Sequence, residues 1–175
     1  MKIKKLTMEN FGLFKKKRSF EFSTDGQKNS TMIIGKNGGG KTTIVYAIRY
    51  ALFGESGLKT HPRQHRLSEW PNYQAAAQGD GEMFVEITLE NDGRDYRLQR
   101  TQKFFQTNTG EMIQLELGDQ LTIFDENGPV KGIDYKAKGR WIKSNILPLE
   151  ASQFLFADLE GSEKYFDPDY NYLLF

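Results

Sequence analysis

A glycine-rich segment, "GKNGGGKTT" at residues 35–43, constrains this sequence more than any other feature. It fits the pattern G-x-x-x-x-G-K-[ST], with glycine at both defined positions, followed by Lys41 and Thr42. The apolar run "STMIIG" precedes it, and residues 41–53 place apolar side chains at helical spacing after it. A buried strand, a glycine-rich turn and a helix in this order predict a loop that binds phosphate.

Each residue type in the segment has a physical reason to bind an anion. The glycines at positions 35, 38, 39 and 40 allow positive φ angles and a close approach, so that successive N–H groups can form an anion nest. The nest leads into a helix N-terminus, whose N–H groups and partial positive charge also attract phosphate. We expect Lys41 to bridge the β- and γ-phosphates of ATP and the Thr42 hydroxyl to bind Mg²⁺. The predicted nucleotide-binding residues are Lys36, Asn37, Gly38, Gly39, Gly40, Lys41, Thr42 and Thr43, of which Thr43 is expected to be mainly structural.

The rest of the chain predicts a single domain of mixed α/β (α+β) class, with an antiparallel β-rich part packed on a strand–helix core. Residues 1–54 contain alternating strands, the glycine-rich segment and a helix that Gly54 ends. Residues 55–81 lack periodicity and predict a long loop, mobile in places, with one short helix. Residues 82–132 predict hairpins with turns at "NDGR" and "ENGP". Residues 133–175 predict a helix that Pro148 ends, followed by the strand "FLFAD".

The run "LTIFDE", residues 121–126, has the form of a Walker B strand, which would supply an acidic ligand for Mg²⁺. Its side chains alternate, however, whereas a buried parallel strand is apolar on both faces. The residues "DENGP" that follow are typical of a turn. We therefore predict that Asp125 and Glu126 end a hairpin and do not bind the metal.

Composition restricts the class of protein further. The chain has 175 residues and no cysteine, which excludes disulfides and thiolate metal sites and fits a reducing compartment. No apolar run approaches the roughly 18 residues that span a bilayer, and we expect a cytoplasmic protein. The formal net charge is only +1, but basic residues crowd the first two predicted strands: Lys2, Lys4, Lys5, Lys15, Lys16, Lys17 and Arg18. Such a cluster is either a solvated face or a surface for phosphate backbones.

Three segments together resemble a known family. The opening "MKIKKLTMENFGLF", the loop of form Gly-x-Asn-Gly-x-Gly-Lys-Thr-Thr and the β-rich part that follows are similar to the N-terminal ATPase lobe of the Rad50 and SMC group of ABC-type ATPases. The late segment "LPLEASQFLFADLEG", residues 147–161, resembles DndD-type proteins of bacterial DNA phosphorothioation systems more closely. Leu155, Ala157 and Leu159 depart from the aromatic and glycine positions of that pattern.

The resemblance implies further site residues and partners. The late segment corresponds to the Q-loop, in which Asp158 stands at the position that contacts Mg²⁺ and the attacking water, with Gln153 as the nearby alternative. Asp158 could instead cap the turn after a strand. Residues 10–14 would lie near the adenine. The family also implies that the chain is one lobe of a head, completed by its own C-terminal lobe beyond a coiled coil, and that two heads enclose ATP as a homodimer.

Two functions of different classes follow from these expectations. The first is an ATPase that couples head closure and hydrolysis to DNA processing, in phage defence and DNA modification or in double-strand break repair, with other subunits of the same complex. The second is a nucleotide-gated scaffold with little turnover. A small P-loop kinase fits poorly, because it needs successive βαβ crossovers where this chain predicts hairpins.

Overall fold

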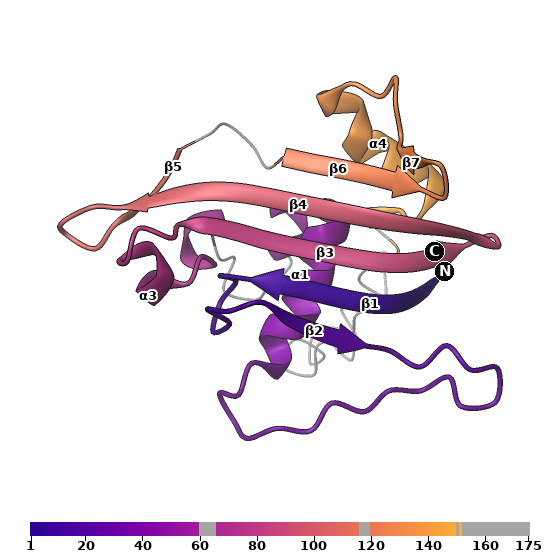
Figure 1. Ribbon diagram of the computed structural model, residues 1–175, viewed down its shortest axis with the longest axis horizontal. Helices are drawn as coiled ribbons and strands as arrows, with labels where there is room; N and C mark the ends of the chain where they lie inside the picture. The colour runs from indigo at the N-terminus through magenta and orange to yellow at the C-terminus, as the bar shows by residue number, and fades with distance from the viewer. Residues whose placement is uncertain (60–65, 116–119, 150, 152–175) are drawn as a thin grey trace, which may run out of the picture.

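The computed structural model describes residues 1–59, 66–115, 120–149 and 151, which form a twisted antiparallel sheet with α1 behind it (Figure 1). The strand order is β2-β1-β3-β4-β6-β7, and β5 pairs with β4 beside this path. The strands are β1 (Lys2–Glu9), β2 (Arg18–Glu21), β3 (Glu82–Asn91), β4 (Arg94–Gln106), β5 (Met112–Gln114), β6 (Gln120–Asp125) and β7 (Gly128–Pro129). The helices are α1 (Lys41–Phe53), α2 (Glu55–Leu58), η1 (Leu67–Glu69), α3 (Tyr73–Ala76) and α4 (Tyr135–Asn145). The predicted mixed α/β class is confirmed.

The longest strand pair follows its sequence signal closely. Residues alternate between buried and partly exposed along β3, as expected of a strand with one face on the core. The turn to β4 falls at the predicted "NDGR", where Asp92 and Gly93 have φ angles of 51° and 75°. Two consecutive positive φ angles define the tight turn that matches the twist of paired strands. The local sequence therefore determines this hairpin.

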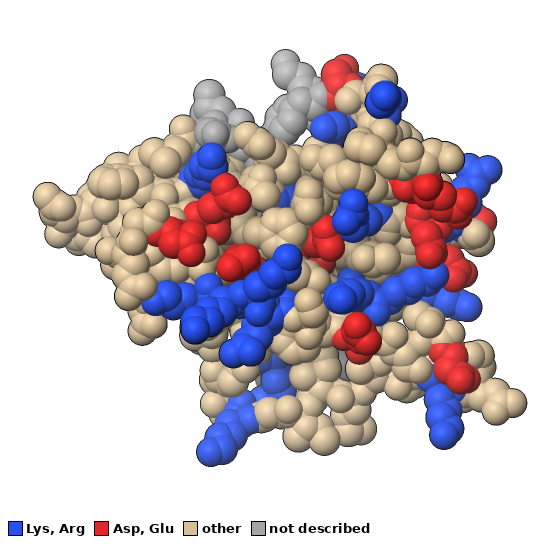
Figure 2. Space-filling model, viewed as in Figure 1, with Lys and Arg blue, Asp and Glu red and all other residues tan. Residues whose placement is uncertain are grey.

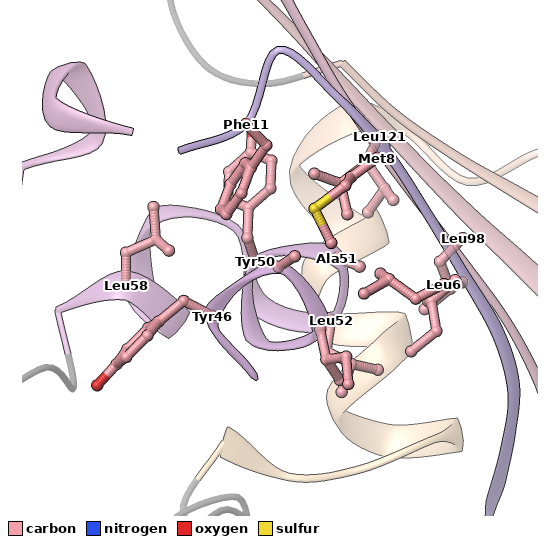
Figure 3. Packing of buried hydrophobic residues seen from close by; sticks show 14 of the residues in the cluster. Leu6, Met8, Phe11, Tyr46, Tyr50, Ala51, Leu52, Leu58, Leu98 and Leu121 are labelled. Atoms are coloured by element: carbon pink, nitrogen blue, oxygen red, sulfur yellow. The ribbon is translucent and has the colours of Figure 1, made fainter. Parts of the chain in front are cut away.

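The core lies between the inner face of the sheet and α1. Figure 3 shows Leu6 and Met8 of β1 and Leu98 of β4 facing Tyr50, Ala51 and Leu52 of α1. Residues 46–52 of α1 are all buried, because α2 and residues 67–70 cover the side of the helix that the sheet does not. A helix buried on every side is a core element rather than an amphipathic surface helix. The position of α1 is therefore fixed from both sides.

The C-terminus of α1 is satisfied by a glycine and by a buried cation. Gly54 has a φ angle of 62°, and its N–H donates to the Tyr50 carbonyl at 2.8 Å, which confirms the predicted helix end. The guanidinium of Arg100, a β4 residue with 4% exposure, donates through Nε to the Ala51 carbonyl at 2.9 Å and through Nη2 to the Leu52 carbonyl at 3.2 Å. These carbonyls lack partners within the helix, and a cation there also opposes the negative end of the helix dipole.

The sequence predicts a long loop with one short helix over residues 55–81, whereas the part of this region that the structure describes has three short helical turns. This region contains α2, η1 and α3, and it buries Leu58, Leu67, Trp70 and Ala75 in or near the core. A Cβ on Gly57 would lie 2.4 Å from the Arg49 carbonyl oxygen, so α2 packs directly on the backbone of α1. Single helical turns are too short to produce a periodic pattern, which is why they leave no signal in the sequence.

The strand predicted at "STMIIG" is wrong. Within the described residues, no strand pairs with residues 30–36, and they form no strand of their own. Met32 and Ile34 are 84% and 86% exposed, and Ile33 is 38% exposed. Figure 1 shows this stretch in the long connection that leaves β2 below the sheet and returns to α1. Apolar composition predicts burial, but the neighbour that would bury this run is not among the described residues.

The predicted C-terminal helix is present as α4. Its N-cap Asp134 accepts a hydrogen bond from the Ala137 N–H at 2.7 Å, and Ile142 and Ile146 are buried as its spacing predicts. The helix ends at Asn145, shortly before Pro148. The predicted strand "FLFAD" lies outside the described residues. No helix in the described ranges is long and apolar enough to cross a membrane.

We predict that replacing Arg100 by leucine destabilises the protein through the end of α1. Arg100→Leu leaves two buried carbonyls without their charged donor, and hydrogen bonds to charged groups contribute about 1.5–3 kcal/mol. The free energy of unfolding, measured by urea denaturation, should fall by about that amount. Arg97→Leu is the matched control on the same strand, because Arg97 is exposed on the outer face, where it contacts Glu86 at 3.8 Å and the Phe124 ring at 4.1 Å but no helix carbonyl. Equal losses in the two variants would contradict the capping role.

Candidate phosphate-binding site

The glycine-rich segment leads directly into α1. Gly40 is the N-cap residue with a φ angle of 91°, and Gly38 has a φ angle of 74°, so both adopt the left-handed conformation that glycine permits. A Cβ on Gly39 would lie 2.9 Å from the Lys36 carbonyl oxygen, which makes glycine necessary there for space. Gly35 has neither constraint, so the prediction of a positive φ at positions 35 and 39 is wrong.

Lys41 is the first residue of α1, and its side chain folds back over the segment. The ammonium Nζ donates to the Gly35 carbonyl at 2.7 Å and to the Lys36 carbonyl at 2.9 Å. These two bonds join the start of the segment to its end and hold a positive charge against the loop backbone. A phosphate oxygen in the same position would be a stronger acceptor than a neutral carbonyl.

The first turn of α1 offers backbone donors next to this charge. The helix has no side-chain cap at its N-terminus, and the Ile44 N–H to Gly40 carbonyl bond at 3.1 Å is its first backbone bond. The N–H groups that precede Ile44 therefore lack partners within the helix. Lys36, Asn37, Gly38, Gly39, Lys41 and Thr42 are exposed to solvent. The structure thus brings the predicted loop residues together as an open group of donors.

A second loop, residues 10–14, packs against this segment. Gly12 has a φ angle of 54°, and a Cβ there would lie 2.6 Å from Cγ2 of Thr43. A Cβ on Gly40 would lie 2.8 Å from the Phe14 ring. Both glycines are therefore required by the close approach of the two loops. The Thr43 methyl group has a structural contact, in keeping with the role expected for this residue.

A cavity of about 430 Å³ opens between the 10–14 loop and the residues that precede α3. Its lining includes Gly12, Leu13, Thr43, Trp70, Pro71 and Tyr73. Leu13 and Tyr73 are exposed, so the cavity offers apolar and aromatic surface close to the first turn of α1. A flat aromatic ligand attached to a phosphate chain fits such a place, because pockets of this kind combine apolar walls with a few polar groups.

Asp125, in the run "LTIFDE" that has the form of a Walker B strand, has a local structural role. Asp125 Oδ1 accepts a hydrogen bond from the Asn127 N–H at 2.8 Å, and Asp125 pairs with Gly128 across the β6–β7 turn. The prediction that this stretch ends a hairpin is confirmed. The described residues contain no cluster of three or more His, Cys, Asp or Glu side chains able to hold a metal ion. Asp158 and Gln153, the Q-loop candidates, lie outside the described residues.

The basic cluster of the first two strands lies on the outer face of the sheet. Figure 2 shows basic side chains in a band across this face, with acidic side chains beside them. Lys4 contacts Asp95 at 2.6 Å and Glu90 at 3.4 Å, and the hydrogen bond to Asp95 raises the pKa of Lys4. Lys5 lies 3.6 Å from Glu21. These pairs offset part of the positive charge and favour the solvated-surface interpretation.

Sequence reasoning missed the residues that support the 10–14 loop. Trp70 and Asn72 contact Gly12 across a sequence separation of about 60 residues, which no local pattern could indicate. Asn72 alone carried a signal, since asparagine before a short helix is typical of an N-cap. That signal predicts the start of α3 and says nothing of the contact with Gly12.

We predict that the contact between Gly12 and Thr43 can be tested by a double substitution. Gly12→Ala should lower the free energy of unfolding by about 2 kcal/mol or more, because the left-handed conformation alone costs an alanine roughly 1–2 kcal/mol and the new methyl group meets Thr43. Thr43→Ser removes Cγ2 and should recover part of the loss in the double variant. Gly26→Ala, at a position with open space, is the control for urea denaturation. Absence of any recovery would disprove the contact.

Comparison with known proteins agrees with this geometry. Residues 5–167 match the family described as "AAA domain". The chain is 30% identical over 166 residues to the "Probable DNA double-strand break repair Rad50 ATPase" of Aquifex aeolicus, covering 91% of this chain and 15% of that protein. It is 30% identical over 121 residues to the "DNA double-strand break repair Rad50 ATPase" of Nanoarchaeum equitans, covering 68% and 13% respectively. It is 26% identical over 145 residues to a subunit of the nuclease SbcCD from Deinococcus radiodurans, covering 77% and 15%.

Among solved structures, the "SMC head domain from Thermotoga maritima" is similar, with a TM-score of 0.42 and 22% identity over 75% of this chain and 39% of that one. The chain spans only 13% to 15% of the length of the three relatives described above. The match to the family nevertheless covers most of the chain, including the glycine-rich segment and the 10–14 loop. We conclude that the chain belongs to the AAA domain family, and that it is similar to a part of Rad50 ATPases.

Proposed function

We propose that this chain is the N-terminal lobe of an ATPase head that binds ATP and Mg²⁺ and couples ATP hydrolysis to the processing of DNA. The observation that carries the proposal is the junction at Gly40, where a glycine-rich segment with left-handed Gly38 and Gly40 enters the first turn of α1 beside Lys41. The names of the relatives, which include Rad50 ATPases and a nuclease subunit, support the same activity.

Each part of the nucleotide has a matching group on this chain. The backbone donors of residues 36–40 and the first turn of α1 would hold the phosphates, and the ammonium of Lys41 would exchange the carbonyls of Gly35 and Lys36 for phosphate oxygens. The Thr42 hydroxyl would bind Mg²⁺, with Asp158 or Gln153 as the second contributor. The adenine would lie in the cavity beside the 10–14 loop, against Leu13 and Tyr73.

When bound, Mg²⁺ supplies charge that offsets the developing negative charge on the transferred phosphoryl group. The chain's own contribution to that step is positional. The loop donors would bind the phosphates at the start of α1, a helix whose residues 46–52 are buried in the core. Lys41 adds one positive charge at the same place. Asp158, by the resemblance, would orient the attacking water.

The exposed run Met32 to Ile34 supports the proposal of a second lobe. Large apolar side chains in a contiguous exposed stretch mark an interaction surface. The backbone of residues 31–34 pairs with no strand among those described, so its donors and acceptors are available to a strand of the protein's own C-terminal lobe. Two such heads would then enclose ATP as a homodimer and act with other subunits of the same complex on DNA. The role would be phage defence and DNA modification, as in DndD-type proteins, or double-strand break repair.

We predict that Lys41→Ala abolishes ATP turnover in the natural full-length protein. Loss of one preorganised charge at the phosphates typically lowers the rate by about a hundredfold or more. Turnover should be measured with and without linear DNA, with Lys131→Ala as an exposed lysine control away from the loop. Undiminished ATP binding and turnover in Lys41→Ala would disprove the assignment of the site. Tight ATP binding without turnover in the unmodified protein, with or without DNA, would favour a nucleotide-gated scaffold.

We also predict that Ile34→Asp lowers ATP turnover of the full-length protein without unfolding this lobe. Ile34 is 86% exposed within the described residues, so a carboxylate there should disturb only what covers it. Leu115→Asp is the control, because Leu115 is an exposed apolar side chain on another part of the chain. Circular dichroism would verify that both variants remain folded. Equal turnover in the two variants would contradict a lobe contact at residues 31–34.

A further inference from the structure

The 10–14 loop is held from its far side by a short segment, residues 70–72, which precedes α3. The Gly12 N–H donates to the Trp70 carbonyl at 2.6 Å, and the Asn72 N–H donates to the Asn10 carbonyl at 2.9 Å. Phe11 and Pro71 pair as an antiparallel bridge. The Phe11 ring stacks on the Trp70 ring, with centroids 5.1 Å apart. The two segments thus form a small two-stranded contact away from the main sheet.

The side chain of Asn72 completes this contact. It is 8% exposed, and its Nδ2 donates to the Gly12 carbonyl oxygen at 2.9 Å. The N–H and the C=O of Gly12 are therefore both bound by the 70–72 segment. On its other side Gly12 meets the Thr43 methyl group, at the distance that leaves no room for a Cβ. Gly12 is held between Asn72 and the first turn of α1.

We propose that Asn72 is a positioning residue for the nucleotide base: through its bond to Gly12 it sets the place of the 10–14 loop, and with it the wall of the cavity in which the base lies. This proposal rests on the function proposed above. A loop fixed before binding does not have to be ordered by the ligand, which increases affinity. The bond from Asn72 acts on the wall of the cavity directly and on the phosphate donors through the contacts of the 10–14 loop with Gly40 and Thr43, so its loss should weaken binding of the base more than binding of the phosphate chain.

The side chain of Asn72 has two separable roles. Its Oδ1 accepts a hydrogen bond from the Ala75 N–H at 3.0 Å and so caps α3, while its Nδ2 holds Gly12. Aspartate and serine are good N-cap residues as well. Asn72→Asp retains the acceptor for Ala75 but replaces the donor by an oxygen, which cannot bind the Gly12 carbonyl. Asn72→Ser retains the cap with a side chain too short to reach Gly12, and it introduces no charge.

The experiment compares ATP with inorganic triphosphate in the natural full-length protein, with Mg²⁺ present. Dissociation constants from calorimetry should show that the unmodified protein binds ATP more tightly than triphosphate, because only ATP has a base. In Asn72→Asp and Asn72→Ser the affinity for ATP should fall by about tenfold, the typical effect of a lost buried hydrogen bond, while the affinity for triphosphate should fall much less. Lys41→Ala should weaken both ligands.

The outcomes distinguish the two proposals. If the unmodified protein binds neither ligand, or if Lys41→Ala binds both normally, the proposed function is overturned and the role of Asn72 with it. If binding depends on Lys41 but both Asn72 variants bind ATP as tightly as the unmodified protein, the positioning role alone is overturned. A loss that is equal for ATP and triphosphate would show a general structural effect and would also overturn it, as would equal affinity of the unmodified protein for the two ligands.

Discussion

The burial of α1 between the sheet on one side and α2 and residues 67–70 on the other is the constraint on which the rest of this structure depends. Residues 46–52 of the helix have no face toward solvent, and Arg100 binds the carbonyls at its C-terminal end. A helix fixed along its length also has a fixed N-terminus. The backbone donors at Gly40 and the ammonium of Lys41 are therefore held in place by packing that lies well away from them. The glycine-rich loop is exposed to solvent, but its position is set by the buried helix to which it is joined.

Two short segments far apart in the sequence bring a second surface to that N-terminus. The 10–14 loop contacts Thr43 and Gly40 on one side and the 70–72 segment on the other. The glycines at these contacts have no space for a side chain, because the Thr43 methyl group lies against Gly12 and the Phe14 ring lies against Gly40. The 10–14 loop and the 70–72 segment thus both support the N-terminus of α1. The coupling is made of hydrogen bonds to Gly12 and of the stacked rings of Phe11 and Trp70.

The outer face of the sheet and the run Met32 to Ile34 differ in what they offer to a partner. The outer face is polar, and two of its lysines form ion pairs with neighbouring carboxylates: Lys4 with Asp95 and Glu90, and Lys5 with Glu21. Such pairs exchange readily with water and commit the surface to no partner. The apolar run has no such compensation, because exposed methionine and isoleucine side chains gain free energy only by leaving water. Of the two surfaces, the apolar run has the stronger physical reason to be covered.

The sequence by itself determined the features that are local. The glycine-rich turn before α1, the Gly54 end of α1, the "NDGR" hairpin, the turn at Asp125 and the helix α4 all follow from glycine positions, turn residues and periodicity within short windows. Only the tertiary structure decided the rest. In the tertiary structure, the short helices α2, η1 and α3 form in a region without hydrophobic periodicity, and the apolar residues Met32 to Ile34 are exposed outside the sheet. Asn72 also binds Gly12, which is 60 residues away in the sequence. The reason is that these outcomes depend on contacts between segments that are far apart in the sequence. The residues adjacent to a position in the chain do not indicate such contacts.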